Sequence, residues 1–155
     1  MKHLAIIGAA SLLFALGILL LSGKKHEREG IEYIFTPKAP QPIGPYSQAV
    51  KYDDMVFLSG QIAIGNDGQI DTSDIVKETT LIMNHLQEVL KASGSSMQRV
   101  VKTTIYLNNL AWFPEVNKVY GSYFETGKAP ARETIGVKSL PKGARVEISM
   151  VAALN

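Results

Sequence analysis

Arg132 and Glu147 are the charged side chains of this sequence that could most readily act on a small molecule carrying a carboxylate group. Arg132 follows Pro130, which favours an extended backbone, and a guanidinium can donate two parallel hydrogen bonds to one carboxylate. Glu147 alternates with apolar residues along a predicted strand, so it points away from the core and could orient a water molecule. Other roles stay open, because Arg132 could form an ordinary salt bridge and Glu147 could pair with Arg132 or Lys102.

Tyr46 and Ser59 are polar residues beside turns, where side chains often line clefts. Each of them could also serve only the structure of its turn. His85 is the single histidine after residue 30, and its place on a predicted helix indicates an exposed flank residue. The sequence therefore offers no histidine pair for RNA cleavage, and we expect neither a metal site nor a Ser-His-Asp triad.

The absence of cysteine and of phosphate-binding glycine motifs removes further classes of chemistry. Without cysteine, the chain has no disulfide, no thiolate nucleophile and no cysteine-bound zinc. Neither GxGxxG nor GxxxxGK[ST] occurs, so the sequence gives no sign of a nucleotide cofactor held by such a loop. We expect a site that works without a metal or an organic cofactor.

The charge of the chain argues against a nucleic-acid partner. The 16 basic and 14 acidic residues give a net charge of +2. Four of these bases and two of these acids lie among the first 30 residues, which leaves 12 of each sign in residues 31–155. Nucleic-acid binders usually carry a basic stripe that neutralises phosphates. The balanced charge of this region therefore predicts no nucleic-acid partner.

Residues 4–22 form an uncharged, mostly aliphatic run near the N-terminus. Its length is close to the roughly 20 residues that cross a bilayer, and it exceeds the roughly 7–15 apolar residues of a signal peptide. We therefore predict that residues 1–30 are a membrane anchor or signal segment with its linker, and that residues 31–155 are one domain. The basic residues after the run favour a membrane-anchored protein with a cytoplasmic domain, with a periplasmic or exported domain as the alternative.

The periodicity of residues 31–155 predicts an α+β domain. Strands are expected at about 31–35, 55–62, 99–107, 134–137 and 145–152. Two helices are expected, one capped by Ser73 or Asp74 and running to about 92, the other spanning about 112–125. In the strand at 55–62, Leu58 and Gly60 would share the core face. This order of elements favours a single mixed sheet with both helices packed on one face.

The outer face of the predicted sheet also carries apolar side chains. Phe57, Tyr106 and Val151 alternate with the core positions of their strands. An apolar face of this kind is usually buried against another surface, and a second copy of the same chain is the simplest partner. These residues predict a homo-oligomer.

A series of short motifs follows along the predicted domain. They are Ile43-Gly44-Pro45-Tyr46-Ser47-Gln48-Ala49, Ser59-Gly60-Gln61, Val101-Lys102-Thr103-Thr104, Val116-Asn117, Pro130-Ala131-Arg132, Leu140-Pro141-Lys142 and Val146-Glu147-Ile148. In this order and spacing, over about residues 33–153, they resemble the Rid family, also called the YjgF family. The resemblance implies a chorismate-mutase-like α+β fold, a homotrimer, and ligand sites in the clefts between subunits.

The resemblance also implies an activity and the residues that carry it. Archetypal members are enamine/imine deaminases acting on 2-aminoacrylate and related products of pyridoxal-phosphate enzymes. The chain is therefore expected to hydrolyse such 2-imino acids to 2-oxo acids and ammonia. By position, Arg132 matches the carboxylate-binding arginine, and the other signature residues of the deaminase branch are matched by Tyr46, Ser59 and Glu147. Further substrate-binding positions are matched by Gly60, Asn117 and Thr134.

The sequence departs from the family pattern in two ways. Glu133 and Thr134 follow Arg132 in place of a small pair such as Ser-Cys, and the apolar N-terminal segment is unlike typical members, which begin close to the first strand. As a strand neighbour, Glu133 should point to the opposite face from Arg132 and so tune the site without abolishing it. Two other functions stay open at this stage. One is a non-catalytic binding or sensor module for small carboxylates, which would share Arg132; the other is a holdase-type interaction protein in which the cleft is incidental.

Overall fold

The computed structural model describes residues 30–65, 67–71 and 73–154. Its elements are β1 (Glu32–Ile34), β2 (Ala49–Tyr52), β3 (Met55–Gln61), α2 (Ile75–Ala92), β4 (Val100–Leu107), α3 (Phe113–Gly121), β5 (Ala131–Gly136) and β6 (Val146–Ala153). The strands form one six-stranded sheet in the order β1-β2-β3-β6-β4-β5. β4 and β5 are parallel, and the other neighbouring strands are antiparallel.

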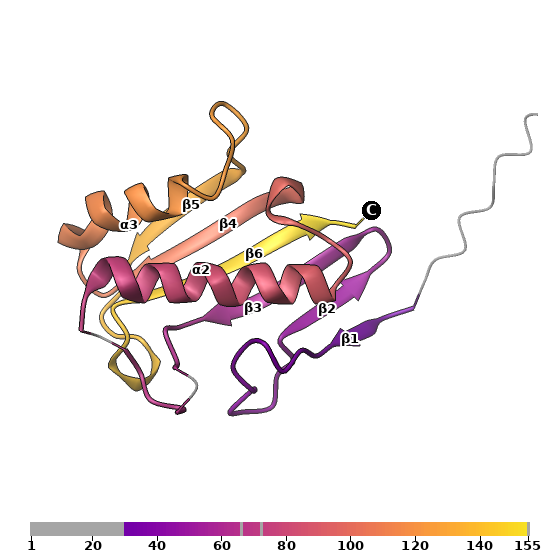
Figure 1. Cartoon of the computed structure of the whole chain (residues 1–155), viewed down its shortest axis with the longest axis horizontal. Helices are drawn as coiled ribbons and strands as arrows, with labels where there is room; N and C mark the ends of the chain where they lie inside the picture. Colours follow the sequence, from indigo (N-terminus) through magenta and orange to yellow (C-terminus); the bar gives the residue numbers. More distant parts are fainter. Residues whose placement is uncertain (1–29, 66, 72, 155) are drawn as a thin grey trace, which may run out of the picture.

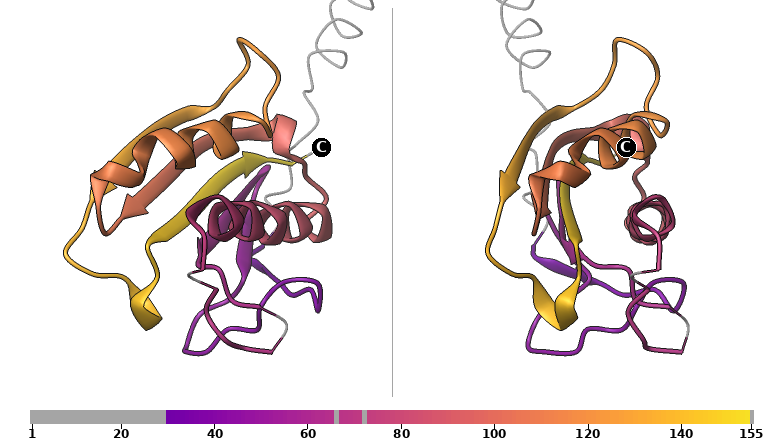
Figure 2. Two further views of the ribbon diagram at one scale, coloured as in Figure 1. Left: turned by 60° about the vertical axis from the view of Figure 1, so that its left-hand side comes forward. Right: turned by 90° about the vertical axis from the view of Figure 1, so that its left-hand side faces the viewer.

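Both helices lie on the same face of this sheet (Figures 1 and 2). The core fills the space between the helices and the sheet, and its fully buried side chains include Ile82, Leu86, Ile105, Ile148 and Met150. Burial of such aliphatic side chains is the main favourable contribution to folding. The predicted fold class, a single mixed sheet with two helices on one face, is confirmed.

α2 forms where a capping residue precedes a helical pattern of apolar residues. Asp74 is the cap, because its Oδ1 accepts hydrogen bonds of 2.9 Å from the N–H groups of Val76 and Lys77. The apolar face of the helix is buried against the sheet and includes Leu86. Gly94, with a φ of 76°, follows the last turn and allows the chain to leave the helix axis. The predicted helix and its cap are therefore confirmed.

The structure contains one strand that the sequence pattern did not predict. β2 pairs with β3 through a turn in which Tyr52 and Met55 are register partners, so only Asp53 and Asp54 form the connection. Asp53 has a φ of 50°, a left-handed conformation that aspartate adopts more readily than most residues. The hairpin connects the loop that carries Tyr46 to β3, which carries Ser59 and Gly60.

A β-bulge corrects the predicted orientation of β3 near Gly60. The register with β6 shifts between Leu58, which pairs with Met150, and Gln61, which pairs with Ile148. The shift buries Gln61 and turns Gly60 away from the core face, where uninterrupted alternation placed it. A Cβ atom on Gly60 would overlap the Glu147 carboxylate. Gly60 therefore faces the same side of the sheet as Glu147.

Glu78 is a fully buried carboxylate that ties α2 to the start of β6. Its Oε2 accepts a hydrogen bond of 2.8 Å from Arg145 Nε. Its Oε1 accepts bonds from the backbone N–H groups of Arg145, at 2.8 Å, and Val146, at 3.3 Å. The Arg145 guanidinium also lies over the Trp112 ring, 5.3 Å from its centroid. These contacts fix the backbone immediately before Glu147.

The predicted membrane segment, residues 4–22, lies outside the described residues. Within the described ranges, no helix is both long enough and apolar enough to cross a bilayer. A spanning helix needs about 20 consecutive apolar residues, whereas α2 has 18 residues that include Lys77 and Glu78. This finding contradicts the membrane-anchored localisation predicted from the sequence, and that prediction is not retained. The domain boundary at residue 30 stays a prediction.

Candidate active site

One cavity of about 390 Å³ is lined by four of the residues that the sequence analysis singled out. These residues are Tyr46, Ser59, Gly60 and Glu147. The remaining lining residues are Ile43, Gly44, Ile62, Ile64 and Pro141. β3 and β6 supply one wall, and the loop before β2 supplies Tyr46. We call this cavity the glutamate pocket.

Hydrogen bonds to the loop that precedes β2 position both Ser59, on β3, and Tyr46, in the loop itself. The Ser59 hydroxyl donates to the Ser47 carbonyl at 2.6 Å, and the Ser59 N–H donates to the Gln48 carbonyl at 3.0 Å. The Tyr46 hydroxyl accepts a bond from the Ile43 N–H at 3.3 Å. Since the serine proton is engaged and the tyrosine oxygen acts as acceptor, the Tyr46 hydroxyl keeps its own proton available for a ligand.

Glu147 is a half-buried carboxylate, and burial raises the pKa of this carboxyl above its usual value of 4.5. Within the part of the chain that the structure describes, no side-chain or backbone donor bonds to it. A carboxylate in this condition binds a proton more readily than an exposed one. It is therefore suited to take a proton from a water molecule near neutral pH.

Replacing Gly60 with alanine will displace the Glu147 carboxylate. The added Cβ would overlap Oε1 and lie 2.8 Å from Cδ of Glu147, and this end of the side chain can rotate away. If Glu147 is a catalytic base, turnover should fall by about 10-fold or more, since misplacing such a group by 1 Å can cost far more, while the free energy of unfolding changes by less than about 1 kcal/mol. Steady-state kinetics and urea denaturation measure the two effects.

Gly121→Ala is the matched control for this substitution. Gly121 ends α3, and a Cβ added there meets no atom within 4 Å. Alanine is favoured over glycine in a helix by about 1 kcal/mol, so this variant should keep its activity and its stability. Equal activity of the Gly60→Ala and Gly121→Ala variants would exclude the proposed contact with Glu147.

Arg132 lies on β5, an edge strand that β4 separates from β6, the strand of Glu147. Its Nη1 donates a hydrogen bond of 2.6 Å to Asn117 Oδ1 on α3. The guanidinium also lies over two aromatic rings of α3, 5.6 Å from the centroid of Phe113 and 5.1 Å from that of Tyr120. The side chain is exposed. The guanidinium is therefore oriented by α3, and it has no acidic partner among the described residues.

Thr134 and Glu133 occupy the same edge strand as Arg132. The Thr134 hydroxyl oxygen is buried and has no hydrogen-bond partner among the described residues. Glu133 bonds to Lys102 Nζ and to the Thr104 hydroxyl, both at 2.9 Å, and these bonds hold the pKa of its carboxyl below the usual range. Glu133 thus points away from Arg132, as its strand position predicted. We call Arg132, Asn117 and Thr134 the arginine group.

Within one chain, the glutamate pocket and the arginine group are apart. Arg132 is the register partner of Thr103, whose buried side chain faces the helices and accepts a bond from the Tyr120 hydroxyl. Glu147 lies on the other face of the sheet, in register with Tyr106. The predicted site residues therefore form two sets of opposite charge, the glutamate pocket and the arginine group. Within a single chain these two sets are not in contact.

His85 differs from its predicted position as an exposed flank residue. It is only 7% exposed, because the loop at 37–41 covers this side of α2. Gln48 is a second residue whose role was not predicted from the sequence, since its buried amide holds that loop in place. No group of three or more histidine, aspartate or glutamate side chains in the described ranges could hold a metal ion.

Comparison with known proteins places these features in a family. Residues 36–154 match the family described as Endoribonuclease L-PSP. The 2-iminobutanoate/2-iminopropanoate deaminase of Mus musculus is 43% identical over 120 residues, which cover 77% of this chain and 88% of the mouse protein.

Solved structures agree with this assignment. The Rid-family protein YyfA from Yersinia pestis is 40% identical with a TM-score of 0.78, and the match covers 81% of this chain and all of that one. Escherichia coli TdcF, solved with bound serine, is 33% identical with a TM-score of 0.74, and the match covers 80% of this chain and 99% of TdcF. The chain therefore belongs to the Endoribonuclease L-PSP family, the Rid family that its motifs predicted.

Proposed function

We propose that this protein is an enamine/imine deaminase that hydrolyses 2-imino acids of the 2-aminoacrylate type to 2-oxo acids and ammonia. The observation that carries the proposal is the pair of half-sites. One holds a half-buried carboxylate with no partner, and the other holds an exposed guanidinium with no acidic partner. The name of the mouse relative, 2-iminobutanoate/2-iminopropanoate deaminase, supports the same reaction.

The reaction needs a fixed substrate and a water molecule beside its imine carbon. Arg132 would hold the substrate carboxylate through two parallel hydrogen bonds, with Asn117 fixing the guanidinium. Glu147 would accept a proton from the water as its oxygen bonds to the imine carbon. The electron pair of the C=N bond moves to the nitrogen, which takes up the proton that Glu147 received, and an amino alcohol results. Its hydroxyl proton then passes to the amino group, ammonia leaves, and the hydroxyl oxygen becomes the carbonyl of the 2-oxo acid. During these steps the Tyr46 hydroxyl would donate a hydrogen bond to the substrate atom that carries charge or to the amino group that leaves.

A homotrimer would unite the two half-sites across a subunit boundary. The outer face of the sheet and its edges expose apolar side chains that one chain leaves uncovered, including Phe57 at 47%, Val101 at 46% and Ile135 at 42%. Such a surface favours association with further copies of the chain. In that assembly the arginine group of one subunit would face the glutamate pocket of the next, and substrate would bind between them.

Two other functions are less well supported by the arrangement of residues. A sensor for small carboxylates would need the arginine group, but it would not need a carboxylate with a raised pKa in a cavity that also holds Tyr46 and Ser59. The family's descriptive name refers to RNA cleavage, yet His85 is the one histidine in the described ranges and it lies outside the glutamate pocket. The imine deaminase is therefore the function that we put forward.

The direct test is release of 2-oxobutyrate and ammonia from freshly generated 2-iminobutyrate by the full chain. We expect release well above the spontaneous rate, measured by coupled reduction of the oxo acid. Saturable binding of 2-oxobutyrate without any acceleration of imine hydrolysis would instead assign the protein to the class of small-carboxylate binders. If the protein neither accelerated imine hydrolysis nor bound 2-oxobutyrate, the proposed active site would be rejected.

The pH dependence of turnover should reflect the raised pKa of Glu147. The carboxylate acts as a base only when it is ionised, so kcat/KM should fall as the pH drops through the pKa of this group. Because burial raises that pKa, the midpoint of the acid limb should lie above 4.5. The Glu147→Gln variant should lack this limb and turn over about 100-fold more slowly, as expected for loss of a general base. If the acid limb of the pH profile were unchanged in the Glu147→Gln variant, the limb would report the pKa of another group.

A further inference from the structure

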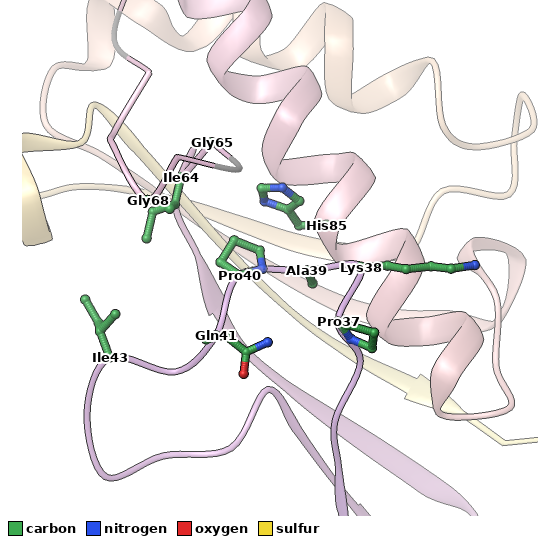
Figure 3. A pocket seen from close by; sticks show the side chains of 10 residues that line it. All are labelled: Pro37, Lys38, Ala39, Pro40, Gln41, Ile43, Ile64, Gly65, Gly68 and His85. Carbon is green, nitrogen blue, oxygen red and sulfur yellow. The ribbon is translucent and has the colours of Figure 1, made fainter.

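A second cavity, of about 280 Å³, lies beside α2 and outside the proposed chemistry. Its walls include Pro37, Pro40 and Ile43 from the loop after β1, Ile64 and Gly65 from the loop after β3, and His85 from α2 (Figure 3). We call it the histidine pocket. Lys38 also borders it, but the Lys38 side chain extends away from the cavity (Figure 3). Its ammonium group lies 3.8 Å from the Glu88 carboxylate.

His85 and Gln41 are the polar side chains of this pocket that form no hydrogen bond among the described residues, and His85 is the buried one of the two. The residue is 7% exposed, and its Nδ1 is buried without a hydrogen bond among the described residues. Figure 3 shows the imidazole projecting from α2 toward Pro40 and Gly65. Burial lowers the pKa of the ring below its usual 6.5, so the ring is neutral at pH 7 and has one donor and one acceptor nitrogen. Unsatisfied buried nitrogens are uncommon in folded proteins because each costs free energy.

The walls of the histidine pocket are held in place by hydrogen bonds. On one side, the Gln48 amide, 1% exposed, donates to the carbonyls of Thr36, Ala39 and Pro40 at 3.0, 3.2 and 2.9 Å. On the other side, the Gly65 N–H donates to the Gln69 carbonyl at 2.8 Å. The cavity is therefore preformed, as small-molecule sites usually are.

We propose that the histidine pocket binds a small, neutral, planar molecule that is largely apolar and hydrogen-bonds to the His85 imidazole. The proline and isoleucine walls favour an apolar body. The imidazole favours one polar group, which would meet Nε2, the ring nitrogen that is not enclosed, because Nδ1 has no exposed surface. A charged ligand is disfavoured because the bordering cation, Lys38, already has Glu88 as its partner. A dry cavity of about 150 Å³ accommodates benzene, so this larger one has room for a fused two-ring molecule.

The histidine pocket shares two walls with the glutamate pocket. Ile43 and Ile64 line both cavities, and the Ile43 N–H donates to the Tyr46 hydroxyl. A ligand that packs against Ile43 would shift the tyrosine that borders the proposed active site. Occupancy should therefore change KM for the 2-imino acid, and this part of the inference rests on the proposed function.

Indole is a suitable probe, and benzofuran is its matched control because it has the same shape without the N–H. We would titrate the full chain with each compound and follow the His85 ring signals by NMR. Indole should bind saturably, and benzofuran should bind about 10-fold more weakly, the effect of one hydrogen bond. The His85→Leu variant, which fills the same space without a polar atom, should bind indole and benzofuran equally.

The Glu147→Gln variant separates this site from the proposed active site. Indole binding should be unchanged in that variant, and indole should raise or lower KM in the wild type. Absence of saturable indole binding, or equal binding by the wild type and His85→Leu, would overturn the histidine pocket as a ligand site. Binding is read by NMR without turnover, so a failure of the deaminase proposal would leave this result intact. Binding without a change in KM would overturn only the coupling.

Discussion

Replacing Arg132 with alanine is expected to lower kcat/KM for a 2-imino acid by about 100- to 1,000-fold, the loss typical of removing one partner of a charged, hydrogen-bonded pair. Within the arginine group, only the Arg132 guanidinium could neutralise the substrate carboxylate. Its orientation by Asn117, at 2.6 Å, and by the Phe113 and Tyr120 rings is fixed before substrate binds. Stopped-flow measurement of oxo-acid release gives the size of the effect.

Arg132→Lys and Lys138→Ala are the controls for this prediction. Lysine keeps the charge but lacks the planar fork, so Arg132→Lys should retain more activity than Arg132→Ala while staying well below the wild type. Lys138 is an exposed lysine in the segment after β5, and its loss should leave kcat/KM unchanged. If Arg132→Ala and Lys138→Ala had the same activity, Arg132 would have no part in substrate binding.

Replacing Glu78 with alanine should lower the free energy of unfolding by about 3–5 kcal/mol, as is typical when one partner of a buried ion pair is removed. The change leaves the Arg145 guanidinium without its partner and two backbone N–H groups, of Arg145 and Val146, without an acceptor. Because these groups precede Glu147, turnover should also fall. Urea denaturation followed by circular dichroism measures the stability.

Glu125→Gln is the control for the Glu78 prediction. Glu125 pairs with Lys128 at 2.9 Å on the surface, where both side chains are more than half exposed. Loss of such a pair costs less than about 1 kcal/mol. A similar small loss in the Glu78→Ala variant would show that the buried pair contributes little net stability.

The fold could be predicted largely from sequence because its main elements carry strong local signals. The apolar spacing of α2 and its Asp74 cap specified that helix, and β-branched residues specified β4. β2 was missed for two reasons. Its turn to β3, Asp53-Asp54, lacks the glycine that usually marks a hairpin, and its four residues are too few to show a clear alternation of apolar and polar side chains. The bulge at Gly60 was missed because a register shift depends on the partner strand, which local alternation does not reveal.

The candidate site could be predicted residue by residue, but its spatial arrangement could not. The alternation around Glu147 and the neighbour relation of Arg132 and Glu133 are local properties, so the faces on which these side chains lie followed from the pattern. That Arg132 and Glu147 occupy separate places in one chain depends on strand pairing, because Arg132 is in register with Thr103, on the helix side of the sheet, and Glu147 with Tyr106, on the other side. The burial of His85 likewise depends on a loop that is distant in sequence.

The central claim, that substrate binds between the arginine group of one subunit and the glutamate pocket of the next, is tested most directly with mixed trimers. Arg132→Ala and Glu147→Gln chains should each be nearly inactive alone. After denaturation and refolding as an equimolar mixture, each mixed trimer would hold one intact site. The account then predicts recovery of about a quarter of wild-type activity, since a cyclic arrangement pairs an intact Arg132 with an intact Glu147 at one position in four. No recovery from mixtures that contain folded, mixed trimers would contradict it.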